Sequence, residues 1–154
     1  PADVELAKKE AQELYQEAGE MVLGTDESTF NHILCLRSVP QLRETFIQYK
    51  AISGNDIEQA IESEMSGNLQ MGFLAIVKST RNVALYFAER FFKSMKGAGT
   101  NDRTLIRAIV SRSEVDMATI KEEFQKANGK TLAEFIKGDT AGDYRKILLA
   151  IVKE

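Results

Sequence analysis

Two loops and two acidic residues contain the groups in this sequence that are best suited to chemistry. One loop reads Gly97-Ala98-Gly99-Thr100, and 38 residues separate its threonine from Asp139. The other loop ends in Gly24-Thr25, and the same 38 residues separate this threonine from Glu64. Glycine lets the backbone turn its carbonyl oxygens outward, because no Cβ obstructs the left-handed conformations. Carbonyl and carboxylate oxygens suit Ca²⁺, which takes about six to eight oxygens and tolerates irregular geometry.

The recurrence of this pattern favours a metal site over an ordinary turn. Taken alone, Gly97-Ala98-Gly99-Thr100 is typical of a turn between helices, and Glu64 or Asp139 would be an acid at a helix end or in a loop. Carbonyl oxygens carry no formal charge, so a calcium site needs a carboxylate nearby. Since both copies provide an acid at the same spacing, we predict a calcium site in each.

The two copies are parts of an internal duplication. Moving the second half of the sequence back by 75 residues aligns it with the first half without a gap. The aligned positions include Gly24-Thr25 with Gly99-Thr100, Arg37-Ser38 with Arg112-Ser113, Tyr49 with Phe124, Gly54 with Gly129, Ile61 with Ile136, Glu64 with Asp139, Gly67 with Gly142, and Ala75-Ile76-Val77-Lys78 with Ala150-Ile151-Val152-Lys153. We therefore predict two tandem units, residues 1–79 and residues 80–154.

The apolar pattern within each unit is helical. One apolar stripe with the spacing of a helix face runs over Val39, Leu42, Phe46, Tyr49 and Ile52. Alternating strand-like runs and hairpin dipeptides are absent from the sequence. We predict an all-α fold with five short helices in each unit, ten in all, and no sheet.

Four pairs of residues have the spacing of a helix-capping box, in which side chains satisfy free backbone N–H groups. They are Ser38 with Gln41, Asn55 with Glu58, Ser113 with Asp116, and Thr131 with Glu134. Pro40 follows Ser38 and Val39, which places it just inside a helix, where its missing N–H costs nothing.

Composition excludes several classes of function. The 20 basic and 23 acidic residues give a net charge of −3, which argues against nucleic-acid binding and against polybasic attraction to membranes. There is no apolar run near the roughly 18 residues of a membrane span. The sequence offers no G-x-S-x-G motif, no Walker loop and no EF-hand loop, so we expect no enzyme.

Several other residues are expected to be structural. The single cysteine, Cys35, excludes an internal disulfide and fits a reducing compartment, and its apolar neighbours predict a buried, inert thiol. His32 has no partner at a spacing that suits metal or triad chemistry. Met71, Phe73 and Leu74 are expected in the core.

The motifs resemble those of the annexin family over nearly the whole chain. "MKGAGTNDRTLIRAIVSRSEVD" and "KGDTAGDYRKILLAIV" resemble the last of an annexin's four repeats, and "AGEMVLGTDESTF" with "EMSGNLQMGFLAIVK" resembles the third. The resemblance implies five-helix repeats that bind Ca²⁺ and dock onto acidic phospholipid membranes. It also implies a cytoplasmic protein that is peripheral at membranes when calcium is present.

The resemblance also implies the ligands of each calcium ion. In the second unit these are the carbonyl oxygens of Met95, Gly97 and Gly99 with both oxygens of Asp139. In the first unit they are the carbonyl oxygens of Gly19, Val22 and Gly24 with both oxygens of Glu64. Leu23, Lys96 and Arg103 are the residues expected to contact the membrane.

Three carbonyls and a bidentate carboxylate provide five oxygens, which is fewer than Ca²⁺ prefers. Lipid phosphate oxygens would complete the shell at a membrane, so calcium and lipid should each raise the affinity for the other. The bound cation would also explain how an acidic protein attaches to an acidic membrane. The alternative interpretation is a calcium-independent helical scaffold for protein or cytoskeletal partners, in which the loops are incidental.

The length of the chain departs from the four repeats of an annexin, and its start at Pro1 rather than Met suggests a fragment or a processed product. Each unit would then expose an apolar helix face that the missing repeats would cover. We therefore expect self-association, as a dimer or larger, or association with the missing repeats.

Overall fold

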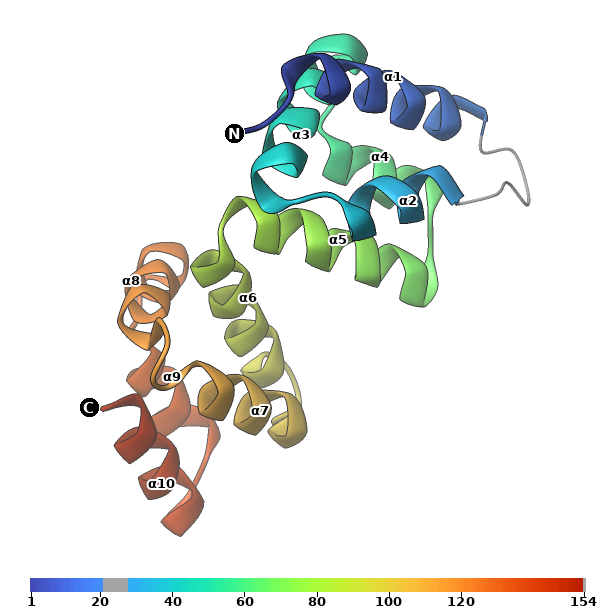
Figure 1. Cartoon of the computed structure of the whole chain (residues 1–154). Coiled ribbons are helices and arrows are strands. Elements are labelled where there is room, and N and C mark those ends of the chain that lie inside the picture. The colour runs from blue at the N-terminus through green and yellow to red at the C-terminus, as the bar shows by residue number, and fades with distance from the viewer. Residues whose placement is uncertain (21–27, 154) are drawn as a thin grey trace. The chain divides into compact units, whose positions relative to one another are not determined.

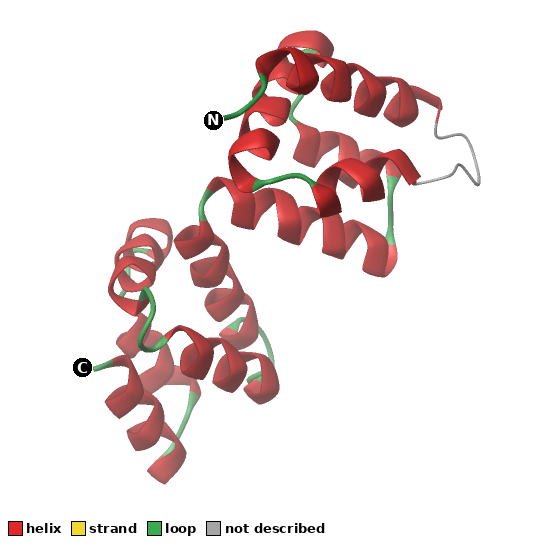
Figure 2. Ribbon diagram, viewed as in Figure 1, coloured by secondary structure: helices red, strands yellow, loops and turns green. Residues whose placement is uncertain are grey.

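The computed structural model describes residues 1–20 and 28–153, and these residues form ten α-helices and no strand (Figures 1 and 2). The all-α prediction is therefore confirmed for the described part of the chain. The helices divide into two compact units, Pro1–Arg81 and Asn82–Glu154. The boundary expected after residue 79 lies in the last turn of the helix that ends at Arg81.

Each unit contains five helices in the same order. In the first unit they are α1 (Val4–Glu20), α2 (Ser28–Leu36), α3 (Val39–Ser53), α4 (Ile57–Glu64) and α5 (Gly67–Arg81). In the second unit they are α6 (Val83–Met95), α7 (Asp102–Arg112), α8 (Met117–Asn128), α9 (Leu132–Asp139) and α10 (Gly142–Val152).

The glycines aligned by the duplication have matching backbone conformations. Gly54 and Gly129 follow α3 and α8 with φ values of 75° and 72°. Gly67 and Gly142 begin α5 and α10 with φ values of 63° and 60°. A side chain would be strained in this left-handed region, so glycine ends one helix and starts another at the same places in both units.

The helix starts agree with the predicted capping boxes at one of four positions. Thr131 and Glu134 form the reciprocal box at the start of α9. In α4 the box is made by Asp56 and Gln59, one residue after the predicted Asn55. Ser38 precedes α3 without a side-chain cap bond.

The predicted cap at Ser113 is also wrong, and its partner Asp116 has another role. The Asp116 carboxylate accepts hydrogen bonds from the Arg112 guanidinium, with Arg112 Nε 2.8 Å from Asp116 Oδ1. The Ser113 hydroxyl donates to the carbonyl of Val110. The ion pair thus takes the place of the capping box predicted for the start of the next helix, α8.

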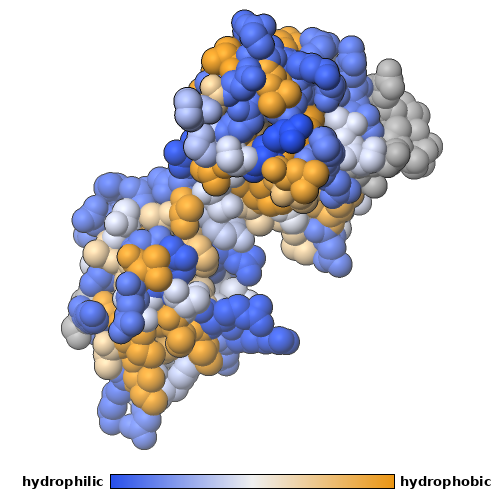
Figure 3. Space-filling model, in the orientation of Figure 1, coloured by the Kyte–Doolittle hydropathy of each residue, from blue (hydrophilic) through white to orange (hydrophobic). Residues whose placement is uncertain are grey.

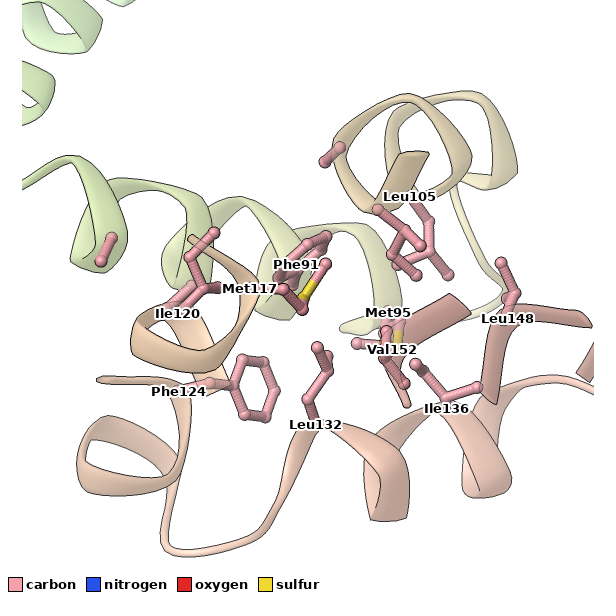
Figure 4. Close-up of a cluster of buried hydrophobic side chains, with 14 residues drawn as sticks. Phe91, Met95, Leu105, Met117, Ile120, Phe124, Leu132, Ile136, Leu148 and Val152 are labelled. Atoms are coloured by element: carbon pink, nitrogen blue, oxygen red, sulfur yellow. The ribbon is translucent and has the colours of Figure 1, made fainter. Parts of the chain in front are cut away.

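Each unit has its own hydrophobic core. In the second unit, aromatic, aliphatic and methionine side chains from all five helices meet in one cluster (Figure 4). The labelled members are Phe91, Met95, Leu105, Met117, Ile120, Phe124, Leu132, Ile136, Leu148 and Val152. In the first unit, Leu42, Phe46 and Tyr49 of the predicted stripe are buried in the corresponding cluster.

Four side chains predicted to be apolar contacts or core are exposed instead. Val39 and Ile52 lie at the two ends of α3, and only the centre of their stripe is covered. Met71 is 60% exposed, because two residues along a helix place it on the side opposite the buried Phe73. Cys35 is exposed, since it lies outside the buried face of α2.

Apolar side chains also appear among polar ones on the visible face of each unit in Figure 3. No described helix is long and apolar enough to cross a membrane.

Two isoleucines of α7 provide a test of the core. Ile109 is fully buried, whereas Ile106, on the same helix, is 42% exposed. Ile109→Ala should lower the free energy of unfolding by about 2–5 kcal/mol, since it leaves a cavity among packed side chains. Ile106→Ala should change it by less than about 1 kcal/mol. Chemical denaturation measures both, and equal losses would show that the second unit does not have this core.

Candidate calcium-binding site

The two predicted acids lie at equivalent places in the two units. Glu64 is the last residue of α4, and Asp139 is the last residue of α9. Each helix ends in an extended residue, Met65 or Thr140, whose N–H donates to the carbonyl four residues earlier. The same local structure therefore presents a carboxylate at the end of the fourth helix in both units.

The glycine loop of the second unit connects α6 to α7. Its base is closed by a hydrogen bond of 2.7 Å from the Asn101 N–H to the Ser94 carbonyl. The Asn101 side chain then caps α7 by accepting from the N–H of Thr104. Between these anchors, Gly97 and Gly99 adopt φ values of 119° and 99°, which only glycine tolerates readily. Both glycines are exposed.

A threonine side chain joins this loop to Asp139. The Thr100 hydroxyl donates to the Asp139 carboxylate and lies 3.1 Å from the Asp139 carbonyl oxygen. The structure thus brings the loop and the acid together across the 38 intervening residues. The sequence pattern identified Thr100 only as part of a motif, and its role as the direct partner of Asp139 was missed.

Tyr144, in the first turn of α10, is a second residue that the sequence did not indicate. Its hydroxyl is buried and has no hydrogen-bond partner in the described part of the chain. Burial has the largest effect, the Asp102 carboxylate near the hydroxyl adds to it, and the charge of Asp139 contributes least; together they raise the pKa of Tyr144 to about 12. An uncharged phenol therefore lies close enough to Asp139 to interact with its charge.

The site in the first unit is described only in part. Glu64 is exposed and accepts a hydrogen bond of 3.1 Å from the Ser63 hydroxyl. Gly19 lies near the end of α1. Val22, Leu23 and Gly24 lie outside the described residues, so the ligands assigned to this loop remain a prediction.

The two basic residues expected at the membrane are exposed. Lys96 follows α6, and its ammonium lies 5.4 Å from the centre of the Phe92 ring. Arg103 is in the first turn of α7.

The donors present fit Ca²⁺ better than a metal that requires several side-chain ligands. Within residues 1–20 and 28–153, no three His, Cys, Asp or Glu side chains form a group that could hold a metal ion. A half-buried carboxylate beside a glycine loop instead combines one charge with backbone oxygens, which are hard ligands. Any ion here would depend on backbone carbonyls for most of its protein ligands.

Comparison with known proteins identifies the family of the chain. Residues 9–76 and 86–151 match the annexin family. The chain is 55% identical to human annexin A11 over 149 residues, which is 97% of this chain and 29% of that protein. It is 56% identical to mouse annexin A4 over 97% of this chain and 46% of that protein.

Solved structures agree with the sequence comparison. A structure of an annexin A8 mutant superimposes with a TM-score of 0.95 at 49% identity, over 100% of this chain and 48% of that one. Chicken annexin V gives a TM-score of 0.89 at 48% identity, over 100% and 48%. The chain therefore belongs to the annexin family. It spans about half the length of annexin A4 and a smaller share of the longer annexin A11.

The unpartnered hydroxyl of Tyr144 leads to a prediction. Because a buried hydroxyl without a partner is destabilising, Tyr144→Phe without calcium should leave the free energy of unfolding unchanged or raise it by about 1 kcal/mol. The folded-state pKa of about 12 exceeds the ordinary 10.0. The unfolded protein therefore loses the phenol proton first, and wild-type stability should fall as pH rises from 10 towards 12.

The Phe variant lacks this phenol, so its stability should fall less over the same pH interval. Denaturation in chelator at neutral and at alkaline pH measures both effects. A loss of more than about 1 kcal/mol in the variant at neutral pH would mean that the hydroxyl has a stabilising partner.

Proposed function

We propose that this chain binds Ca²⁺ at its interhelical loops and attaches, through the bound ions, to acidic phospholipid membranes. The observation that carries the proposal is the hydrogen bond from the Thr100 hydroxyl to the Asp139 carboxylate, because it joins the glycine loop to an acid. Membership of the annexin family supports it, as does the similarity to a calcium-bound annexin, (Sm)1, at 31% identity and a TM-score of 0.85.

In the second unit, the proposed ligands are the carbonyl oxygens of Met95, Gly97 and Gly99 and both carboxylate oxygens of Asp139. Glycine at two of these positions permits the positive φ values that the loop requires. In the first unit, Glu64 provides the carboxylate, with the carbonyls of Gly19, Val22 and Gly24. A single carboxylate in each site gives an affinity on the order of 10⁻⁴–10⁻³ M without lipid.

The Asp139 carboxylate is already a hydrogen-bond acceptor when no ion is present. An ionised carboxylate has about four lone-pair sites, so calcium can bind both oxygens while the Thr100 hydroxyl keeps its hydrogen bond. The hydroxyl holds the acid close to the loop beforehand, which reduces the conformational entropy that binding must overcome. This arrangement favours a weak site that is largely formed in advance.

Lipid phosphate completes the coordination shell in this proposal. Each ion has about five protein oxygens, so open positions accept water in solution and phosphate oxygens at a membrane. Calcium and lipid then raise each other's affinity by the same factor. We propose that Leu23, Lys96 and Arg103 contact the membrane. In this proposal the protein binds to the surface of the membrane. The absence of catalysis, and the self-association or association with further annexin repeats, remain predictions.

The acid of the second unit is the most direct target. Asp139→Asn keeps the shape of the side chain but removes the formal charge, so the calcium needed for half-maximal lipid binding should rise roughly tenfold. Co-sedimentation with phosphatidylserine vesicles across a calcium titration measures this. Asp143→Asn is the matched control, because Asp143 is exposed in the next helix and pairs with Lys146. It should leave the titration unchanged, and equal shifts would refute the assigned site.

Glu64→Gln tests the first unit in the same assay, with the exposed Glu62→Gln as its control. Glu64→Gln should raise the calcium requirement, and the double variant with Asp139→Asn should raise it further, since two sites then lack their charge. Lipid binding by the double variant that matches wild type, or binding that survives chelation, would favour a calcium-independent scaffold.

A further inference from the structure

The facing sides of α6 and α7 form a cavity with an unusual set of charges. Its volume is about 330 Å³, which lies at the lower end for small-ligand sites. It is lined by Tyr86, Phe87, Arg90, Arg103, Thr104, Arg107, Ala108 and Ser111. Three of these side chains are arginines, which end in guanidinium groups, and none is acidic. The lining is therefore basic, although the net charge of the protein is −3.

The three arginines make no hydrogen bond or ion pair within the described residues. They differ in this respect from the arginines around a second cavity, in the first unit. There Arg81 pairs with Asp56 and Glu58, and Arg43 donates to the carbonyl of Thr80. Arg112, close to the first cavity, pairs with Asp116 and lies over the Phe87 ring. Unpaired cations around one cavity are therefore a local feature and not a property of every arginine here.

The arginines approach the cavity from two helices. Arg103 and Arg107 are four residues apart on α7, so they lie on one face of that helix, and Arg90 lies on α6. A guanidinium presents its N–H donors in a fixed fork that matches the oxygens of phosphate. Tyr86 and Thr104, whose side chains carry neutral hydroxyl donors, also line the cavity. The arrangement suits an anion that has several oxygens and more than one charge.

We infer that this cavity binds a phosphate ester with two or more phosphate groups, independently of calcium. A soluble polyphosphate and a multiply phosphorylated lipid headgroup share this chemistry. A ligand with several negative charges can compensate more of the three guanidinium charges than a singly charged ligand can. The inference does not depend on the proposed calcium sites, because no calcium ligand lines the cavity.

Calorimetric titration of the whole chain with pyrophosphate, in chelator and at low salt, tests this inference. Wild type should bind saturably, and binding should weaken as salt is added. Arg90→Gln, Arg103→Gln and Arg107→Gln should each raise Kd roughly tenfold. The control is Lys130→Gln with Lys137→Gln, since both lysines are exposed in the second unit and neither lines the cavity. It should change Kd less than about twofold.

Backbone NMR of wild type provides a readout that does not depend on how the variants fold. Pyrophosphate should shift amide signals of α6 and α7 and leave α1–α5 unchanged. Absence of saturable binding at millimolar pyrophosphate, equal loss in the lysine control, or shifts located elsewhere would overturn the assignment. Equal loss in the lysine control, or shifts located elsewhere, would mean that pyrophosphate binding depends on the overall charge of the protein and not on this cavity.

Vesicles identify the source of the phosphate. If lipid headgroups fit the cavity, the protein should bind vesicles that contain a bisphosphorylated inositol lipid in the presence of chelator. Pyrophosphate should displace the protein from these vesicles. Phosphatidylserine vesicles should not bind the protein under the same conditions. If neither vesicle binds while pyrophosphate does, the ligand is a soluble ester. Binding of the inositol lipid that pyrophosphate does not displace would place lipid recognition outside the cavity and contradict the inference for headgroups.

Discussion

The hydrogen bond between Thr100 and Asp139 is the constraint on which the candidate site depends. It joins a loop between two helices to the end of a helix 39 positions further along the chain. Both sides of the bond are fixed by their surroundings: Asn101 caps α7 and closes the loop onto Ser94, while the end of α9 is held by the buried Ile136. The core of the second unit thus determines where the acid lies relative to the glycines.

The duplication extends this constraint to the first unit. Glu64 ends α4 as Asp139 ends α9, and paired glycines have φ values within a few degrees of each other. Such agreement requires the same local backbone in both units, even where side chains differ, as Met65 and Thr140 do. Glu64 is nevertheless exposed, whereas Asp139 is half-buried. The two carboxylates therefore differ in how much water surrounds them before an ion binds. Screening by water should make a charge at Glu64 interact more weakly with its surroundings.

Helical periodicity and repeated spacing were enough to predict the fold class and the duplication. The helical periodicity depends on local sequence. The glycines and Thr131 likewise act on the backbone next to them, at helix ends. The exposure of Cys35 and Met71 could not be predicted in this way, because it depends on which face of a helix the neighbouring helices cover. The positions of Tyr144 and of the unpaired arginines likewise follow from how helices pack against one another. Asp116 formed an ion pair instead of a cap, since Arg112 competed for it.

The central claim is that Asp139 and the glycine loop hold one calcium ion together. A crystal structure grown with calcium, and examined for the anomalous scattering of the ion, tests it most directly. The account predicts a peak about 2.3–2.6 Å from both Asp139 carboxylate oxygens and from the carbonyl oxygens of Met95, Gly97 and Gly99. A structure at millimolar calcium in which Asp139 still accepts only from Thr100, with no peak beside the loop, would contradict it.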